Sequence, residues 1–183
     1  MRGRKVHRET VDYKGKIREI ADFPKAGVSF KDITTLLQDG STYRSAVDDI
    51  ASYARSCGAE VIVGPEARGF VIGGPVAYAL GLGFVPVRKP GKLPAETVEI
   101  RYQLEYGEDR LSMHRDSLRQ GQRVVVVDDL LATGGTVNST VELVRRLGGD
   151  VVGTAFLIEL RSLRGRERLC GLDVFSLVQY DED

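Results

Sequence analysis

The chain has 183 residues, with 26 basic and 26 acidic side chains that balance to a formal net charge of zero at pH 7. This length fits one domain with a sizeable core, and the balanced charge gives no global field that would attract nucleic acid or a membrane surface. Isolated Cys57 and Cys170 indicate neither a disulfide framework nor a zinc site, and the lack of a signal-like or other long apolar run predicts a cytoplasmic protein.

The predicted elements begin with an N-terminal segment, about residues 10–37. Aliphatic residues spaced among charges predict a short amphipathic helix over 10–21. Residues 25–34 have neither a helical nor a strand period, which predicts a surface loop. Its single aromatic residue, Phe30, is a candidate for stacking on a ligand.

From about residue 41 onward, predicted helices and strands alternate. The apolar periodicities predict, in order, a helix over 41–57, a strand over 61–63, a helix over 71–80, strands over 84–87, 98–104, 111–114 and 124–127, a helix over 137–147, and strands over 151–158 and 174–178. We interpret 98–114 as a hairpin or flap and the charged run 161–168 as a solvated connection. The alternation predicts one α/β domain with a doubly wound, mainly parallel sheet, and leaves the N-terminal segment as a candidate lid.

The stretch 124–136 combines three kinds of chemistry. Four valines are typical of a strand buried on both faces, and Asp128 and Asp129 follow at its carboxyl end, where open α/β sheets bind ligands. The next residues, Ala-Thr-Gly-Gly-Thr at 132–136, offer backbone N–H groups, hydroxyls and a helix N-terminus to a phosphate. The stretch matches neither the Walker loop nor the dinucleotide fingerprint. It predicts a polyol held by carboxylates beside a bound phosphate, although α/β proteins without a ligand also show this pattern.

Two further predicted strands end in charged turns. An acid and an arginine lie in the turn Glu66 to Gly69, and the densest cationic run within the fold follows the next strand at Arg88 to Lys92. A solvated charged turn is the alternative interpretation of the second run. Because the carboxyl ends of parallel strands meet at one edge of a sheet, a polyol between two phosphate groups would satisfy all three strand ends.

Five segments in this order resemble the type I phosphoribosyltransferases and, within them, the adenine-specific branch. The resemblance spans about residues 14–180 and is carried by Phe23 to Ile33, Glu66 to Phe70, Arg88 to Pro94, Leu104 to Gly107 and Asp128 to Thr136. It implies the type I phosphoribosyltransferase fold, with a small N-terminal hood at about 10–37, a core at about 41–183 and a β flap. It also implies transfer of a phosphoribosyl group from 5-phosphoribosyl 1-pyrophosphate (PRPP) to adenine, giving AMP and pyrophosphate in purine salvage.

The resemblance also implies roles for the residues that match the family's motifs. Asp128 and Asp129 would accept hydrogen bonds from the ribose hydroxyls. The 5-phosphate would be held by Ala132, Thr133, Gly134, Gly135 and Thr136. Pyrophosphate would lie on Glu66, Ala67, Arg68 and Gly69, with a cis peptide between Glu66 and Ala67, and would also bind Arg88, Lys89 and Lys92. Mg²⁺ would bridge the diphosphate and ribose, with no direct protein ligand expected.

The base half of the site is implied to come from other segments. Adenine would stack between Phe30 and Leu130, its amine and N1 would meet the backbone of Ser29, and Arg68 would approach N7. Glu105 on the flap is the implied acid/base residue, and the neighbouring Tyr106 would help to exclude water. Relatives of this kind are usually homodimers, which implies the same assembly here.

Two departures from the family pattern lie in the hood. Lys31 stands where many relatives have arginine, which keeps the charge and loses the planar fork. Ala26 replaces a frequent proline, which predicts a less rigid loop.

Two alternatives to adenine transfer follow from the same sequence. One is the same reaction on guanine, hypoxanthine or xanthine, because the motif at 124–136 identifies the activated sugar and cannot select the base. The other is a ligand-sensing regulator without catalysis. The sequence argues against a regulator, because its basic N-terminus is too short for a DNA-binding domain and Glu105 is present.

Overall fold

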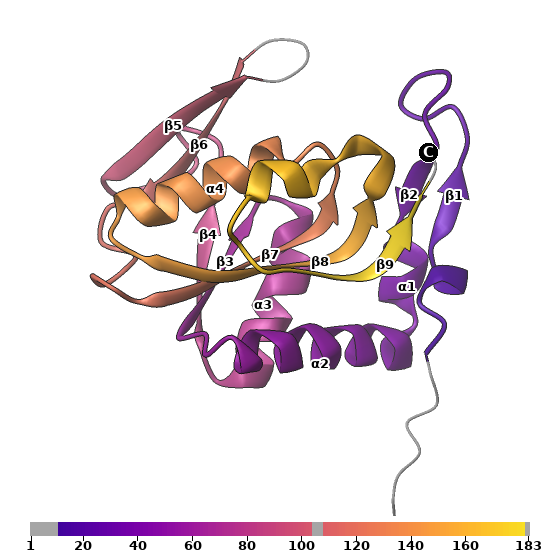
Figure 1. Ribbon diagram of the computed structural model, residues 1–183, viewed down its shortest axis with the longest axis horizontal. Helices are drawn as coiled ribbons and strands as arrows, with labels where there is room; N and C mark the ends of the chain where they lie inside the picture. Colours follow the sequence, from indigo (N-terminus) through magenta and orange to yellow (C-terminus); the bar gives the residue numbers. More distant parts are fainter. Residues whose placement is uncertain (1–10, 104–107, 182–183) are drawn as a thin grey trace, which may run out of the picture. The chain divides into compact units, whose positions relative to one another are not determined.

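The computed structural model describes residues 11–103 and 108–181 (Figure 1). The chain divides into two compact units, Met1–Ser45 and Ala46–Asp183. The boundary falls inside helix α2 (Gly40–Ser56), close to the predicted helix start at residue 41.

The first unit contains a short antiparallel strand pair. After the 3-10 turn η1 (Lys14–Lys16), strand β1 (Arg18–Ile20) pairs with β2 (Phe30–Asp32), and helix α1 (Thr34–Gln38) follows. The helix predicted over 10–21 is therefore wrong within the described residues, and the loop predicted over 25–34 contains a strand. A hydrogen bond between charged side chains links the two strands, since Nε of Arg18 on β1 donates to Oδ2 of Asp32 on β2 at 3.0 Å.

The second unit is built on a five-stranded parallel sheet. Strands β3 (Val61–Pro65), β4 (Gly83–Val87), β7 (Arg123–Leu131), β8 (Asp150–Leu160) and β9 (Val174–Tyr180) lie in the order β4-β3-β7-β8-β9. This arrangement confirms the predicted doubly wound, mainly parallel sheet. All four valines at 124–127 are fully buried, as expected for a central strand covered on both faces.

Helices on opposite faces of this sheet create a topological switch point. Helix α3 (Arg68–Leu80) leads from β3 outward to β4, while α4 (Gly135–Arg146) leads from β7 outward to β8 on the other face (Figure 1). The connections that leave the carboxyl ends of the neighbouring strands β3 and β7 therefore run in opposite directions. In an open α/β sheet this divergence opens the crevice that binds ligands.

A β-hairpin extends from the second unit. Strands β5 (Thr97–Gln103) and β6 (Glu108–His114) pair antiparallel, which confirms the predicted hairpin. Its base is held to the end of β4, because the backbones of Arg88 and Ser112 exchange two hydrogen bonds of 3.0 and 2.7 Å. The hairpin also contributes Ile100, Leu111 and Met113 to the main hydrophobic core.

The run 161–168, which follows β8, is exposed except at Gly165, as predicted for a solvated link, and it also has regular structure. It forms two 3-10 turns, η2 (Arg161–Leu163) and η3 (Gly165–Leu169). Gly165 and Leu169 are buried, and Arg166 pairs with the buried Glu159. The sequence did not predict these contacts, because runs of charged residues are usually solvated.

Candidate active site

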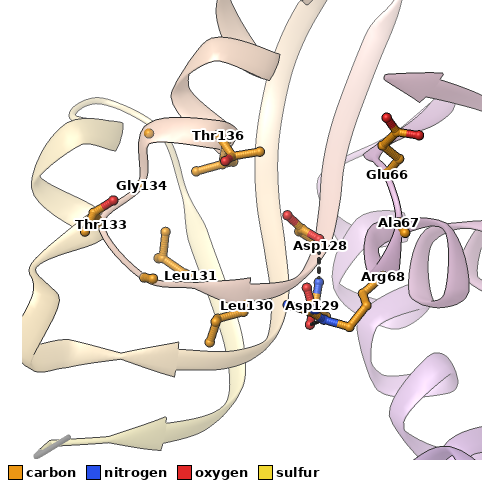
Figure 2. A pocket seen from close by; sticks show the side chains of 13 residues that line it. Glu66, Ala67, Arg68, Asp128, Asp129, Leu130, Leu131, Thr133, Gly134 and Thr136 are labelled. Carbon is orange, nitrogen blue, oxygen red and sulfur yellow. Dashed lines mark hydrogen bonds and ion pairs between the residues drawn. The ribbon is translucent and has the colours of Figure 1, made fainter. Parts of the chain in front are cut away.

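A pocket opens at the switch point between β3 and β7 (Figure 2). Its cavity of about 270 Å³ lies entirely within the second unit. The lining residues come from the turn after β3 and from the end of β7 with the loop behind it, and they are Glu66, Ala67, Arg68, Asp128, Asp129, Leu130, Leu131, Ala132, Thr133, Gly134, Gly135, Thr136 and Val137. The structure therefore brings together two of the three strand ends that the sequence singled out.

The two carboxylates at the end of β7 face different partners. Asp129 is buried and accepts a hydrogen bond from Nε of Arg68, which reaches it from the start of α3 (Figure 2). Asp128 accepts from the backbone N–H of Asp129 at 2.8 Å. Burial, and then the charge of the neighbouring Asp129, raise the pKa of Asp128 well above its ordinary value. A positive charge bound near Asp128 would therefore favour the ionised form of this carboxyl group.

The loop after β7 curves around one end of the pocket (Figure 2). It reaches helix α4 through Gly134, whose φ of 80° lies in the left-handed region that favours glycine. An α-helix leaves the N–H groups of its first turn without acceptors within the helix, and its dipole favours an anion there. With the side chains of Thr133 and Thr136 beside these N–H groups, the loop has the donors that a phosphate requires.

The turn after β3 faces this loop across the pocket. Its Glu66–Ala67 peptide is cis, as the family resemblance implied. The next glycine, Gly69, does not line the pocket but packs directly behind it, since a Cβ there would lie 2.9 Å from Oδ1 of Asp128. The turn and the carboxylates are therefore in close contact.

The cations predicted to bind pyrophosphate gather around Glu66 and are not among the residues that line the pocket. Nε of Arg88 lies 2.9 Å from one Glu66 oxygen, and Nζ of Lys92 lies 3.2 Å from the other. The backbone N–H of Lys89 donates to Glu66 at 2.8 Å. Burial would raise the pKa of Glu66, but these three interactions outweigh it and lower the pKa. Glu66 is therefore an ionised anchor for the cationic run.

The residues predicted to read adenine come from both units. Leu130 and Arg68 line the pocket in the second unit, and Ser29 and Phe30 belong to the first. Phe30 packs edge-on against Phe23 with ring centroids 5.1 Å apart. Nζ of Lys31, on a side chain only 4% exposed, donates to Oγ of Ser29 at 2.9 Å and pairs with Glu19 at 3.1 Å. These contacts hold the side chain of Ser29 in place.

Two apolar residues that were not predicted as site residues also line the pocket. Leu131 and Val137 flank the loop at 132–136, and both are buried in the hydrophobic core. Glu105 and Tyr106 lie outside the described residues, so their roles stay predictions.

Comparison with known proteins places this geometry in a family. Residues 37–182 match the phosphoribosyl transferase domain. The chain is 59% identical to an adenine phosphoribosyltransferase of Desulfitobacterium hafniense over 172 residues, which are 94% of this chain and 99% of the relative.

Solved structures show the same similarity. The crystal structure of adenine phosphoribosyltransferase from Thermoanaerobacter pseudethanolicus has a TM-score of 0.89 at 52% identity, covering 92% of this chain and 98% of that one. The enzyme from Saccharomyces cerevisiae, solved in complex with an iminoaltritol bisphosphate and adenine, has a TM-score of 0.86 at 34% identity, covering 90% and 96% of the two chains. The chain therefore belongs to the phosphoribosyl transferase family and, within it, to the adenine phosphoribosyltransferases.

Proposed function

We propose that this pocket transfers the phosphoribosyl group of PRPP to adenine, giving AMP and pyrophosphate in purine salvage, as the family does. One observation carries the proposal. Paired carboxylates, a phosphate-binding loop and the Glu66–Ala67 turn line a single cavity at one switch point. The three features match the ribose, 5-phosphate and diphosphate of PRPP.

The end of β7 is the proposed sugar subsite. Asp128 and Asp129 accept hydrogen bonds from the ribose hydroxyls, and residues 132–136 bind the 5-phosphate through backbone N–H groups and threonine hydroxyls. As pyrophosphate leaves, positive charge develops on the ribosyl carbon. The two carboxylates stabilise that charge, and it in turn favours the ionised form of Asp128, whose pKa is raised in the free protein.

The turn after β3 and the cationic run form the proposed pyrophosphate subsite. The backbone of Glu66 to Gly69 supports the diphosphate. Arg88 and Lys92 are held beside the pocket by Glu66, and their side chains keep 35% and 50% of their surface exposed. They, with Lys89, supply positive charge to the departing pyrophosphate.

In the second unit, Leu130 and Arg68 line the pocket, and they are the proposed contacts of adenine there: Leu130 stacks on one face of the base and Arg68 approaches N7. The roles of Ser29 and Phe30, in the first unit, stay predictions. In the reaction, N9 of adenine forms a bond to the ribosyl carbon while the bond to the pyrophosphate oxygen breaks. Glu105 accepts the N7 proton that adenine loses as this bond forms, and Tyr106 shields the reacting atoms.

Magnesium is the proposed cofactor. Mg²⁺ prefers oxygen ligands and is commonly held by one or two carboxylates together with substrate phosphates. Here oxygens of the diphosphate and ribose of PRPP would supply most of the ligands, and no direct protein ligand is proposed, since the described residues contain no cluster of three or more side chains that could hold a metal ion. When bound, the ion neutralises negative charge on the leaving pyrophosphate.

We also propose a cytoplasmic homodimer. Helix α3 presents apolar side chains to solvent, with Val71 38% and Tyr78 89% exposed. Large exposed apolar groups on one helix face are typical of a protein interface. Both cysteines are free, as is usual in a reducing compartment. No helix among the described residues is long and apolar enough to cross a membrane.

An assay of four purine bases with PRPP tests the function. We expect turnover of adenine far above that of guanine, hypoxanthine or xanthine, measured as nucleotide formed per enzyme. Turnover of another base without adenine turnover would assign the chain a different substrate. Binding of PRPP without any turnover would support the regulator instead.

The role of Glu105 is tested by Glu105→Gln. We expect kcat to fall by about 10²- to 10⁴-fold, as for loss of a general acid or base, with the KM for PRPP little changed. Glu99→Gln on the same hairpin is the matched control, because Glu99 pairs with Arg110 at 3.8 Å on an exposed face. Equal kcat values for the two variants would remove Glu105 from the mechanism.

A further inference from the structure

The turn η3 packs against the outside of the phosphate loop, although none of its residues lines the pocket. A Cβ on Gly165 would lie 2.2 Å from the carbonyl oxygen of Ala132 and 3.1 Å from the backbone nitrogen of Gly134. In the other direction, a Cβ on Gly134 would lie 2.6 Å from the carbonyl oxygen of Gly165. The two backbones are thus in direct contact, with no room for a side chain between them.

Arg166 fixes the position of η3. Its Nε and Nη2 donate to the two oxygens of Glu159 at 2.6 and 2.7 Å, and its Nη1 donates to the carbonyl of Val174 at 2.9 Å. Glu159 is only 3% exposed and also accepts from Ser176 at 2.6 Å. Burial would raise the pKa of Glu159, but the Arg166 and Ser176 hydrogen bonds outweigh it and lower the pKa. The turn is therefore held to β8 by a bidentate ion pair, which is geometrically specific, and to β9 by the hydrogen bond to Val174.

The fastening point lies beside the start of the phosphate loop. In the sheet, Glu159 on β8 is paired with Leu131 on β7, and Leu131 directly precedes Ala132. The loop is consequently held from two sides. Strand β8, which contains Glu159, pairs with Leu131, the residue before the loop. The turn η3, positioned by Arg166, packs against the loop on the side away from the pocket.

We propose that Gly165 and the Glu159–Arg166 pair are positioning residues that set the shape of the phosphate loop, and with it the affinity for the 5-phosphate of PRPP. This inference rests on the proposed function, because it takes the loop at 132–136 as the 5-phosphate subsite. A loop that binds through backbone N–H groups cannot correct its geometry by rotating side chains. Its support from behind therefore matters more than it would for a side-chain site.

The first test uses Arg166→Lys and Arg166→Met. Lysine keeps the charge but cannot form the two parallel hydrogen bonds, and methionine loses both. We expect the KM for PRPP to rise about tenfold in Arg166→Met and less in Arg166→Lys, while the KM for adenine stays within twofold, since small displacements of a binding group cost affinity steeply. The control is Arg146→Met, because Arg146 forms an exposed pair with Glu142 on the surface of α4.

The second test uses Gly165→Ala, which places a methyl group against the carbonyl of Ala132. Ribose 5-phosphate binding, measured by calorimetry, is expected to weaken about tenfold while adenine binding is kept. Gly40→Ala is the control, since Gly40 is exposed at the start of helix α2 and a Cβ there would meet nothing within 4 Å. Thermal unfolding of each variant shows whether it folds. If Gly165→Ala does not fold, the Arg166 variants provide the test. The Arg166 side chain is 43% exposed, and Arg166→Lys preserves the charge.

The outcomes separate this inference from the function on which it rests. A parent chain that does not bind ribose 5-phosphate would overturn the proposed sugar subsite and the inference with it. A parent that binds it normally, with folded variants that bind it equally well, would overturn the inference alone. A parallel rise in KM for both substrates would also overturn it, because a general loss of structure would move both.

Discussion

The two proposed anion subsites, one within the pocket and one beside it, differ in how they are built. At the end of β7, one contiguous stretch of 13 residues, 124–136, supplies a buried strand, two carboxylates and a loop that offers backbone N–H groups. At the ends of β3 and β4, the positive charge sits on long side chains that are tethered to Glu66. A backbone subsite takes its shape from packing, whereas a side-chain subsite takes it from ion pairs. The first should therefore respond to changes of volume and the second to changes of charge.

The largest expected effect is on Asp128 at the end of β7. Asp128→Asn removes a charge that would face the developing positive charge on the ribosyl carbon, so we expect kcat to fall by about 10²- to 10³-fold. The same variant should be more stable at neutral pH, because burial and Asp129 raise the pKa of Asp128 and make its ionisation costly for the fold.

The pH dependence of this stability checks the assignment. A carboxyl group whose pKa is raised in the folded state lowers stability as pH rises from its ordinary value of 3.8 through the raised value. The excess Tm of Asp128→Asn over the parent should therefore grow from acidic to neutral pH. A constant difference in Tm across this range would contradict the electrostatic explanation.

The next effect concerns volume in the phosphate loop. Gly134→Ala combines a left-handed φ of 80° with a Cβ only 2.6 Å from the carbonyl oxygen of Gly165. We expect kcat/KM for PRPP to fall about 100-fold, from misplacement of the loop. Gly81→Ala is a matched control, since Gly81 has a similar φ of 68° and a Cβ there would meet nothing within 4 Å. Similar kinetic losses in both variants would show that backbone conformation, rather than the contact with η3, is decisive.

The smallest loss of activity is expected from a substitution of Glu66, which holds the cationic run by ion pairs. Glu66→Gln keeps the shape of the side chain but weakens its hold on Arg88 and Lys92, so the KM for PRPP should rise about tenfold, the scale of a lost charge-assisted hydrogen bond. Because ion pairs are screened by salt, the loss should shrink as ionic strength increases. Glu142→Gln, which removes an exposed pair on α4, serves as the control. A loss that is independent of salt would contradict a charge-based subsite.

The sequence predicted the second unit well because its signals are local. Four consecutive valines at 124–127 identify a central parallel strand, and the carboxylates and glycines that follow identify its function within a few residues. The hairpin was equally clear from its alternation. These elements could be predicted from their own residues, without knowing which segments pack against them.

Predictions failed where a partner far away in sequence determines the structure. The spacing of aliphatic residues over 10–21 suggested a helix, but Arg18 and Asp32 pair across two strands. The run 161–168 is exposed except at Gly165, as predicted for a solvated link, but the sequence did not show that Arg166 pairs with the buried Glu159 or that Gly165 contacts the loop. The pairing of Arg88 and Lys92 with Glu66 was likewise not visible in the sequence, while their predicted role toward pyrophosphate stays a prediction. Periodicity and composition do not report such long-range pairs.

The position of β7 in the sheet has a consequence for local unfolding. This strand is hydrogen-bonded on both sides, to β3 and to β8, and its four valines are fully buried. Amide groups in such a strand exchange with solvent only when the unit opens globally, whereas short two-stranded pairs such as β1–β2 open in local fluctuations. The carboxylates and the loop at 132–136 thus follow a central strand that is paired on both sides. We expect the proposed sugar subsite to keep its geometry through fluctuations that transiently open the strand pair that contains Phe30.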